Sequence, residues 1–308
     1  MMTFPLWAFI AVGGHVANGA AFVIDKSLLT SSFKRAATYA ATVGILSSLA
    51  IVVLFFGAHL PTSVTSWIWI ATGGAAFVLG LWTFFGALAA GEASRVVPII
   101  GSLIPILTFC GTATLLGERL TQTQALGFGL LIVATIILAG GSASSRLSLR
   151  ALWIAILSAT FYALSSLAIK IGYDTEGFVT TFGISRIFSA LTAIAILCID
   201  TKAWIEVRSM FAKKKTGKKT KRTAAVLVLV GQTLGAIGFI LVQYAINLGS
   251  AAIVNALQAV QYAFLVLIAF IFAKRAPRLL GEDLTPSTVF RKSIAIIIVG
   301  IGLWFVVS

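Results

Sequence analysis

The side chains best suited to bind a small polar molecule gather in one part of an otherwise apolar chain. They are amides and a phenol: Gln232, Gln243, Asn255, Gln258, Gln261 and Tyr262. Asn255, Gln258 and Tyr262 follow i, i+3, i+7 spacing, which places them on one face of a helix. An amide buried in an apolar medium costs free energy unless it is hydrogen-bonded. These groups can pair across helices as structural contacts, or they can bind a polar substrate, and we predict that at least two do the second.

A second polar pair lies in the first apolar stretch. His15 and Asn18 are one helical turn apart, near the middle of that stretch. A histidine there can simply hydrogen-bond a backbone carbonyl. It can also contact a ligand or carry a proton, because imidazole titrates near physiological pH. We therefore include both residues in the candidate substrate-binding site.

Two prolines, Pro98 and Pro105, interrupt the fourth apolar stretch and lie near one face of a helix. Each lacks an amide hydrogen and frees the carbonyl four residues before it, in Ser94 and Gly101. In a bilayer such a carbonyl needs a partner from protein, water or ligand. A packing kink satisfied by neighbouring side chains is one interpretation. The other, which we adopt for Pro105, is a partly polar wall of the binding site.

The few ionisable groups in apolar stretches restrict the substrate. Lys170 and Arg186 lie near the ends of their stretches, where they can extend to the membrane interface. If they face the interior instead, they favour an anionic or zwitterionic cargo. The centres of the apolar stretches contain no Asp or Glu. This argues against a proton-coupled exporter of organic cations, which needs a carboxylate in mid-membrane.

The sequence gives no indication of catalysis. We find no cluster of acids, no nucleophile beside a base and no phosphate-binding glycine loop. His15 and His59 do not make a metal pair. Cys110 and Cys198 have no metal-ligand spacing, and we interpret them as small core side chains. We expect no catalytic residue, no metal ion, no cofactor and no use of ATP.

Composition identifies the elements that must position the polar groups. Of the 308 residues, 59% are hydrophobic and only 10% are charged, and the mean hydropathy is +1.04. Soluble domains average about 25% charged residues, so a soluble enzyme is excluded. Apolar stretches long enough to cross a bilayer recur along the whole chain. We predict an all-α integral membrane protein with ten transmembrane helices, at 4–24, 36–58, 66–89, 94–116, 122–140, 151–171, 179–200, 223–246, 250–273 and 290–307.

An internal repeat organises these helices. The segments 115–121 and 279–285 read LLGERLT and LLGEDLT and lie about half a chain apart. Lys26 then pairs with Lys170, and the segment 88–93 pairs with 246–251. Five spans per copy is an odd number, so the two copies must be inverted, as in secondary transporters. We predict a first repeat at 1–140, a linker at 141–150 and a second repeat at 151–308.

The distribution of positive charge predicts the orientation. Twenty of the 23 Lys and Arg fall in the odd-numbered loops, which the positive-inside rule places in the cytoplasm, with both termini outside. Nine of them lie at 202–222, where Trp204, Val207 and Phe211 form an apolar stripe at helical spacing. We predict a short interfacial helix followed by a segment that attracts anionic lipid headgroups, and no binding of nucleic acid.

Several motifs together resemble one family. They are Ile24-Asp25-Lys26 at the end of the first stretch, the sequence SLIP at 102–105, and GERLT at 117–121 before a glycine-containing fifth stretch, with their second-half counterparts. On these motifs the chain resembles a ten-helix member of the drug/metabolite transporter superfamily, of the EamA-like type. The resemblance implies two inverted five-helix repeats around a central cavity that moves small metabolites by alternating access. The chain departs from the family in its predicted external N-terminus, and in Ala263, which stands where a counterpart of Pro105 is expected.

We therefore expect a secondary transporter for a small polar metabolite, such as an amino acid or a related compound, in the plasma or inner membrane. We expect a monomer, because the small-residue spacing of Gly231 and Gly235 suits helix packing within one bundle. The alternative is a flippase for a lipid-linked metabolite, which needs a cavity open sideways to lipid. A membrane enzyme lacks catalytic groups, and a purely structural protein does not explain the amide-rich helices.

Overall fold

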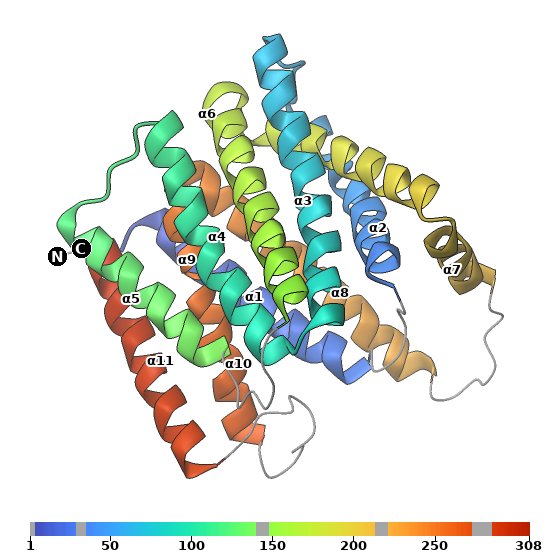
Figure 1. Ribbon diagram of the computed structural model, residues 1–308. Helices are drawn as coiled ribbons and strands as arrows, with labels where there is room; N and C mark the ends of the chain where they lie inside the picture. The colour runs from blue at the N-terminus through green and yellow to red at the C-terminus, as the bar shows by residue number, and fades with distance from the viewer. Residues whose placement is uncertain (1–3, 29–34, 140–147, 213–220, 273–284) are drawn as a thin grey trace.

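The computed structural model describes residues 4–28, 35–139, 148–212, 221–272 and 285–308. Within these ranges every regular element is a helix (Figure 1). In chain order the elements are α1 (Leu6–Leu28), α2 (Ala36–Ser47), η1 (Ser48–Phe56), α3 (Val64–Ala90), α4 (Ala93–Leu115), α5 (Gln122–Ala139), α6 (Leu149–Ile199), α7 (Thr201–Ala212), α8 (Lys221–Leu248), α9 (Ala251–Ala256), α10 (Gln258–Phe272) and α11 (Pro286–Val307).

Helix α6 is two membrane spans joined at one residue. Its 51 residues would make a straight helix about 75 Å long, more than twice the roughly 30 Å of a bilayer core. Gly177 breaks it with φ 75° and ψ 171°, a conformation that glycine adopts without a steric cost. The described residues contain nine helical segments long and apolar enough to cross a membrane, with α6 counted once. Counting α6 twice gives ten, as the sequence predicts.

Large apolar side chains cover the outside of the bundle. Phe55 is 87% exposed, and Phe9, Trp153 and Phe290 are each more than 60% exposed. Soluble monomers rarely expose large contiguous apolar patches, whereas lipid tails are an apolar solvent for such side chains. Together with the length of the helices, this surface makes the chain a multi-pass membrane protein.

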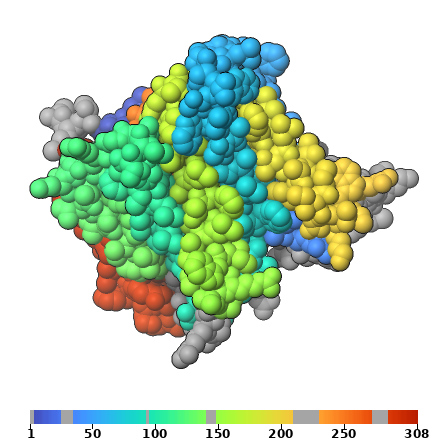
Figure 2. Space-filling view, turned by 45° about the horizontal axis from the view of Figure 1, so that its top comes forward, coloured from blue at the N-terminus to red at the C-terminus, as the bar shows by residue number. Residues whose placement is uncertain are grey.

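Pairs of helices distant in sequence lie side by side. Helix α3 runs along α6, α1 along α8, and α5 antiparallel to α11 (Figures 1 and 2). Serine hydroxyls of α6 donate to glycine carbonyls of α3: Ser165 to Gly73 at 2.7 Å, Ser158 to Gly80 at 3.1 Å and Ser189 to Gly74 at 2.9 Å. Glycine at these positions lets the two backbones approach closely enough for the hydroxyls to reach across.

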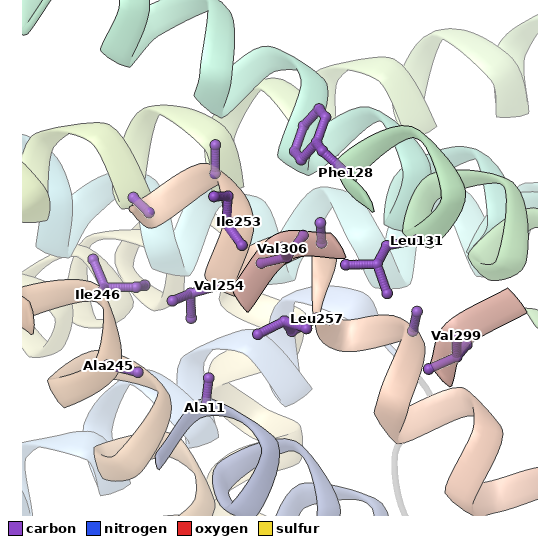
Figure 3. Packing of buried hydrophobic residues seen from close by; sticks show 14 of the residues in the cluster. Ala11, Phe128, Leu131, Ala245, Ile246, Ile253, Val254, Leu257, Val299 and Val306 are labelled. Carbon is purple, nitrogen blue, oxygen red and sulfur yellow. The ribbon is translucent and has the colours of Figure 1, made fainter. Parts of the chain in front are cut away.

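The main core lies where α5, α8, α9 and α11 meet. Figure 3 shows Ile246 of α8, Ile253 of α9, Leu131 of α5 and Val306 of α11 packed around Leu257, the residue between α9 and α10. Each of these side chains is at most 2% exposed. The small residues Ala11 and Ala245 let α1 and α8 join the same core.

Two of the predicted helices are discontinuous. The predicted helix 36–58 is α-helical only to Ser47 and then continues as the 3-10 helix η1. At that junction the hydroxyls of Ser47 and Ser48 donate to the carbonyls three residues back, a contact that competes with regular helical bonding. The predicted helix 250–273 is divided into α9 and α10 by Leu257.

The repeated GE-x-LT motif closes one helix and opens the next. Gly117 has φ +66°, and the amide of Glu118 donates to Thr112 at the end of α4. Thr121 then caps α5 through reciprocal hydrogen bonds with Gln124, the arrangement of a capping box. In the second copy residues 279–284 lie outside the described ranges, and Thr285 stands at the N-cap position of α11.

The predicted interfacial helix is α7. Trp204 and Ile205 are 51% and 65% exposed on it, while Ala203 is buried. Asp200 caps its first turn by accepting hydrogen bonds from the amides of Lys202 and Ala203. Residues 213–220 of the basic segment, and 141–147 of the predicted linker, lie outside the described ranges.

Candidate functional site

The proline-containing helix α4 and the divided ninth predicted helix meet at Asn255. This residue lies in α9, two positions before the break at Leu257, and its amide nitrogen donates to Thr108 Oγ1 of α4 at 3.2 Å and to Ser166 Oγ of α6 at 3.0 Å. Thr108 is fully buried and lies one turn after the buried Pro105. Asn255 therefore joins three helices at the point where two of them are irregular.

His15 reaches the same segment from α1. Its Nε2 lies 2.9 Å from the carbonyl oxygen of Val254. Because a carbonyl only accepts, Nε2 carries the proton. The other nitrogen, Nδ1, is buried without a hydrogen-bond partner among the described residues, and Gln261 of α10 lies beside the ring.

Gln258 and Tyr262 extend the polar surface along α10. Gln258 Nε2 donates to the Tyr262 hydroxyl at 3.2 Å. A β-carbon placed on Gly101 of α4 would lie 3.1 Å from that hydroxyl, so glycine lets the phenol pack onto the segment between the two prolines. Tyr262 also lies near Tyr162 of α6.

A second group of polar side chains lies between α6 and α8. The Tyr173 hydroxyl donates to Gln243 Oε1 at 2.9 Å. Lys170, one turn earlier, pairs with Asp174 at 2.9 Å and lies 3.5 Å from the carbonyl of Asn247. Lys170 is therefore neutralised within its own helix.

Arg186 is the charged group that sequence reasoning misplaced. Its side chain is 1% exposed, so the interpretation that it extends to the membrane interface is wrong. It is nine residues beyond Gly177, about 14 Å along the helix and close to half the bilayer core. Its guanidinium carbon lies 5.1 Å from the ring centroid of Phe77, 5.3 Å from that of Phe182 and 5.1 Å from that of Phe239.

Aromatic side chains connect Arg186 to the polar residues of α10. Phe77 contacts the ring of Tyr162 edge-on, with centroids 6.3 Å apart, and Tyr162 lies near Tyr262. On the other side, Tyr173 lies near Arg186. Phe77 therefore contacts both the guanidinium of Arg186 and the ring of Tyr162.

The remaining predicted residues differ in placement. Asn18 packs against Gly238 of α8, and Pro105 is buried in α4. Gln232 is exposed on α8, and the structure does not bring it to the other amides. Cys110 and Cys198 are also exposed, so their interpretation as core side chains is wrong. The described residues contain no group of three metal-ligating side chains.

Sequence reasoning missed the residues that complete the site. Thr108, Ser166 and Tyr173 are hydroxyl-bearing residues in apolar helices, a pattern too common to single them out. Arg186 carried a signal, because an arginine inside an apolar stretch is rare. The predicted helix 179–200 already placed Arg186 seven residues from its start, so an interior position could have been inferred from the sequence.

No family model matches the sequence, and no curated protein matches it. Solved structures share the fold. One, described only as "Crystal structure of protein", superposes with a TM-score of 0.63 over 96% of this chain and 94% of that chain, at 15% sequence identity. At that identity the likeness concerns the fold alone.

Proposed function

We propose that this membrane protein is a secondary transporter that moves a small polar metabolite by alternating access, with its substrate site among α1, α4, α6, α8 and α10. One observation carries the proposal. The fourth predicted helix carries Pro98 and Pro105, the ninth is divided at Leu257, and Asn255 links the two through Thr108. Interrupted spans at corresponding positions of two repeats mark the substrate site in many secondary transporters.

Paired contacts support the inverted repeat that this function requires. The offset that pairs Lys26 with Lys170 also pairs Gly14 with Ser158 and Asn18 with Tyr162. The offset that pairs the segment 88–93 with 246–251 also pairs Gly80 with Gly238. Gly14 and Asn18 pack on Gly238, and Ser158 and Tyr162 pack on Gly80. Each repeat therefore contributes the same contact to the other, with α1–α8 matching α6–α3.

Charge supports the orientation and the lipid partner. Helices α4, α6 and α11 begin at the same end of the molecule (Figure 1). Arg95 and Arg150 lie in the first turns of α4 and α6, and Arg291 lies in the second turn of α11. This end faces the cytoplasm by the positive-inside rule. Exposed Lys202 and Arg208 on α7, with the basic residues up to 222, then attract anionic lipid headgroups. The chain acts as a monomer in a plasma or inner membrane and uses no catalytic residue, cofactor or nucleic acid.

A thermal-shift screen of the purified protein tests the proposal. Amino acids, nucleosides, polyamines and organic anions are added in turn, since a ligand that binds the native state raises Tm. The proposal predicts a stabilising compound whose effect is lost in Gln258→Ala. The matched control is Gln232→Ala, an exposed amide, which keeps the effect. A compound that stabilises all three proteins equally would place binding elsewhere, and stabilisation by lipid-linked compounds alone would favour a flippase.

A further inference from the structure

Arg186 carries a charge that the described part of the chain leaves without a counter-charge. The ion pairs among the described residues join Lys170 to Asp174, Arg35 to Asp200 and His59 to Glu176. Arg186 takes part in none of them, and it is 1% exposed. Moving an ion from water into a protein interior costs several kcal/mol even after relaxation. A group held in this condition in mid-membrane is a functional candidate.

The hydrogen-bond donors of Arg186 are mostly unused. A guanidinium has five N–H groups. Nε and Nη2 donate to one acceptor, the Ser185 hydroxyl, at 3.3 and 3.2 Å, which leaves three N–H groups. Nη1 is buried with no acceptor among the described residues. A carboxylate accepts two parallel hydrogen bonds from a guanidinium, and the three unused N–H groups include one on each of Nη1 and Nη2 that can supply such a pair.

The three phenylalanine rings hold the charge but do not replace the missing acceptor. A cation–π contact is strongest when it is desolvated, so three of them offset part of the cost of burial. Their π faces provide no oxygen for the N–H groups at the edge of the guanidinium. The rings of Phe77, Phe182 and Phe239 come from α3, α6 and α8, which fixes the guanidinium between three helices.

We propose that Arg186 binds the carboxylate of a substrate that has a single carboxylate group. This inference rests on the proposed transport function and names the substrate class of the same interior site. One cation compensates one negative charge. A dianion would leave a buried charge uncompensated, because Lys170 is already paired with Asp174. Tyr162 and Tyr262 extend from this point toward Gln258 and are placed to contact the uncharged part of the molecule.

The test compares each carboxylate with its amide, in which an uncharged group of the same shape replaces the carboxylate. The purified full chain in detergent is titrated with four pairs: alanine and alaninamide, phenylalanine and phenylalaninamide, lactate and lactamide, 3-phenylpropionate and 3-phenylpropionamide. Binding is measured as the shift in Tm and as Kd by calorimetry. The proposal predicts that in at least one pair the carboxylate binds about tenfold or more tightly than its amide. The absence of a carboxylate preference in all four pairs overturns it.

Two substitutions separate substrate binding from a structural role. Arg186→Met removes the charge and keeps an unbranched side chain between the rings. The proposal predicts that the carboxylate preference disappears, while Tm without ligand stays within about 2 °C of wild type or rises, because an uncompensated buried charge is gone. Arg186→Lys keeps the charge without the planar fork, so it retains a weakened preference. A preference unchanged in Arg186→Met contradicts the proposal.

Flux in proteoliposomes separates this inference from the proposed function. Uptake of the same compounds is measured with wild type and Arg186→Met. Uptake of amides or amines that is unchanged by Arg186→Met overturns the carboxylate site and leaves transport standing. If a carboxylate binds in an Arg186-dependent way but is not transported, the carboxylate site is supported and the proposed transport function is contradicted. If Arg186→Met does not fold, the wild-type comparison of carboxylates with amides decides.

Discussion

Replacing Asn255 by alanine should loosen the junction between α4, α6 and α9. The substitution removes two hydrogen bonds between helices, to Thr108 at 3.2 Å and to Ser166 at 3.0 Å. Hydrogen bonds between membrane helices contribute about 0.6 kcal/mol on average and about 1.7 at most. Thr108 keeps its bond to the Ile104 carbonyl, so its hydroxyl is not left without a partner. We expect Asn255→Ala to lose about 1–2 kcal/mol of stability.

The assay is thermal unfolding of the purified protein, with unfolding in denaturant as a second measurement. A loss of this size corresponds to a fall in Tm of about 3–6 °C. Gln232→Ala is the matched control, because it removes an exposed amide, and its Tm should stay within about 1 °C of wild type.

A double-mutant cycle with Thr108→Val identifies the contact itself. We expect a coupling energy of about 0.6 kcal/mol or more between the two substitutions. Strict additivity of the two substitutions, or a Tm for Asn255→Ala equal to that of Gln232→Ala, would refute the view that Asn255 joins α9 to α4 and α6.

Three further perturbations follow from the packing. Gly80→Leu and Gly238→Leu should both reduce the folded yield measured by gel filtration. A β-carbon at Gly80 would lie 3.1 Å from the Tyr162 ring, and one at Gly238 would lie 2.8 Å from the backbone of α1. An unchanged yield for either variant would contradict the equivalence of the α1–α8 and α6–α3 contacts. Ser189→Ala should lower the free energy of unfolding, measured by denaturant titration, by about 0.5–1.5 kcal/mol, because it removes a buried hydrogen bond to the Gly74 carbonyl. An unchanged free energy of unfolding would mean that this hydrogen bond does not stabilise the fold. Neutralising Lys202 together with the basic residues up to 222 should abolish the rise in Tm that phosphatidylglycerol nanodiscs give over phosphatidylcholine nanodiscs; a rise that persists would place lipid binding elsewhere.

The positions of the helices could be predicted from sequence because each depends on local composition. The predicted helix 94–116 and the observed α4 (Ala93–Leu115) differ by one residue at each end, and 122–140 and α5 agree equally well. The predicted helix 290–307 begins four residues after the observed start of α11 at Pro286, and Arg291 and Lys292, which were counted as loop charges, lie inside both. Charged residues at a membrane interface do not end a helix, since the aqueous layer accommodates them.

The break at Leu257 and the placement of Arg186 could not be predicted in the same way. Leu257 has neither the fixed φ of proline nor the freedom of glycine, so no local rule divides α9 from α10. Its fully buried side chain packs among residues from several helices (Figure 3), and that contact depends on the whole fold. The rings around Arg186 come from α3, α6 and α8, and only the packed bundle brings them together. The amides of α8 to α10 were found from sequence, because buried amides are conspicuous in apolar helices.

Counterflow in proteoliposomes tests alternating access most directly. Vesicles containing the wild-type protein are loaded with an unlabelled carboxylate from the four pairs, here phenylalanine or 3-phenylpropionate, and diluted into a trace of the same compound in labelled form. A carrier that exposes one site to each side in turn accumulates the label transiently above its equilibrium level. Our account predicts this overshoot for at least one of the two compounds, its loss in Arg186→Met and its persistence in Gln232→Ala. Label that only equilibrates, at the same rate in all three proteins and in empty vesicles, would contradict it.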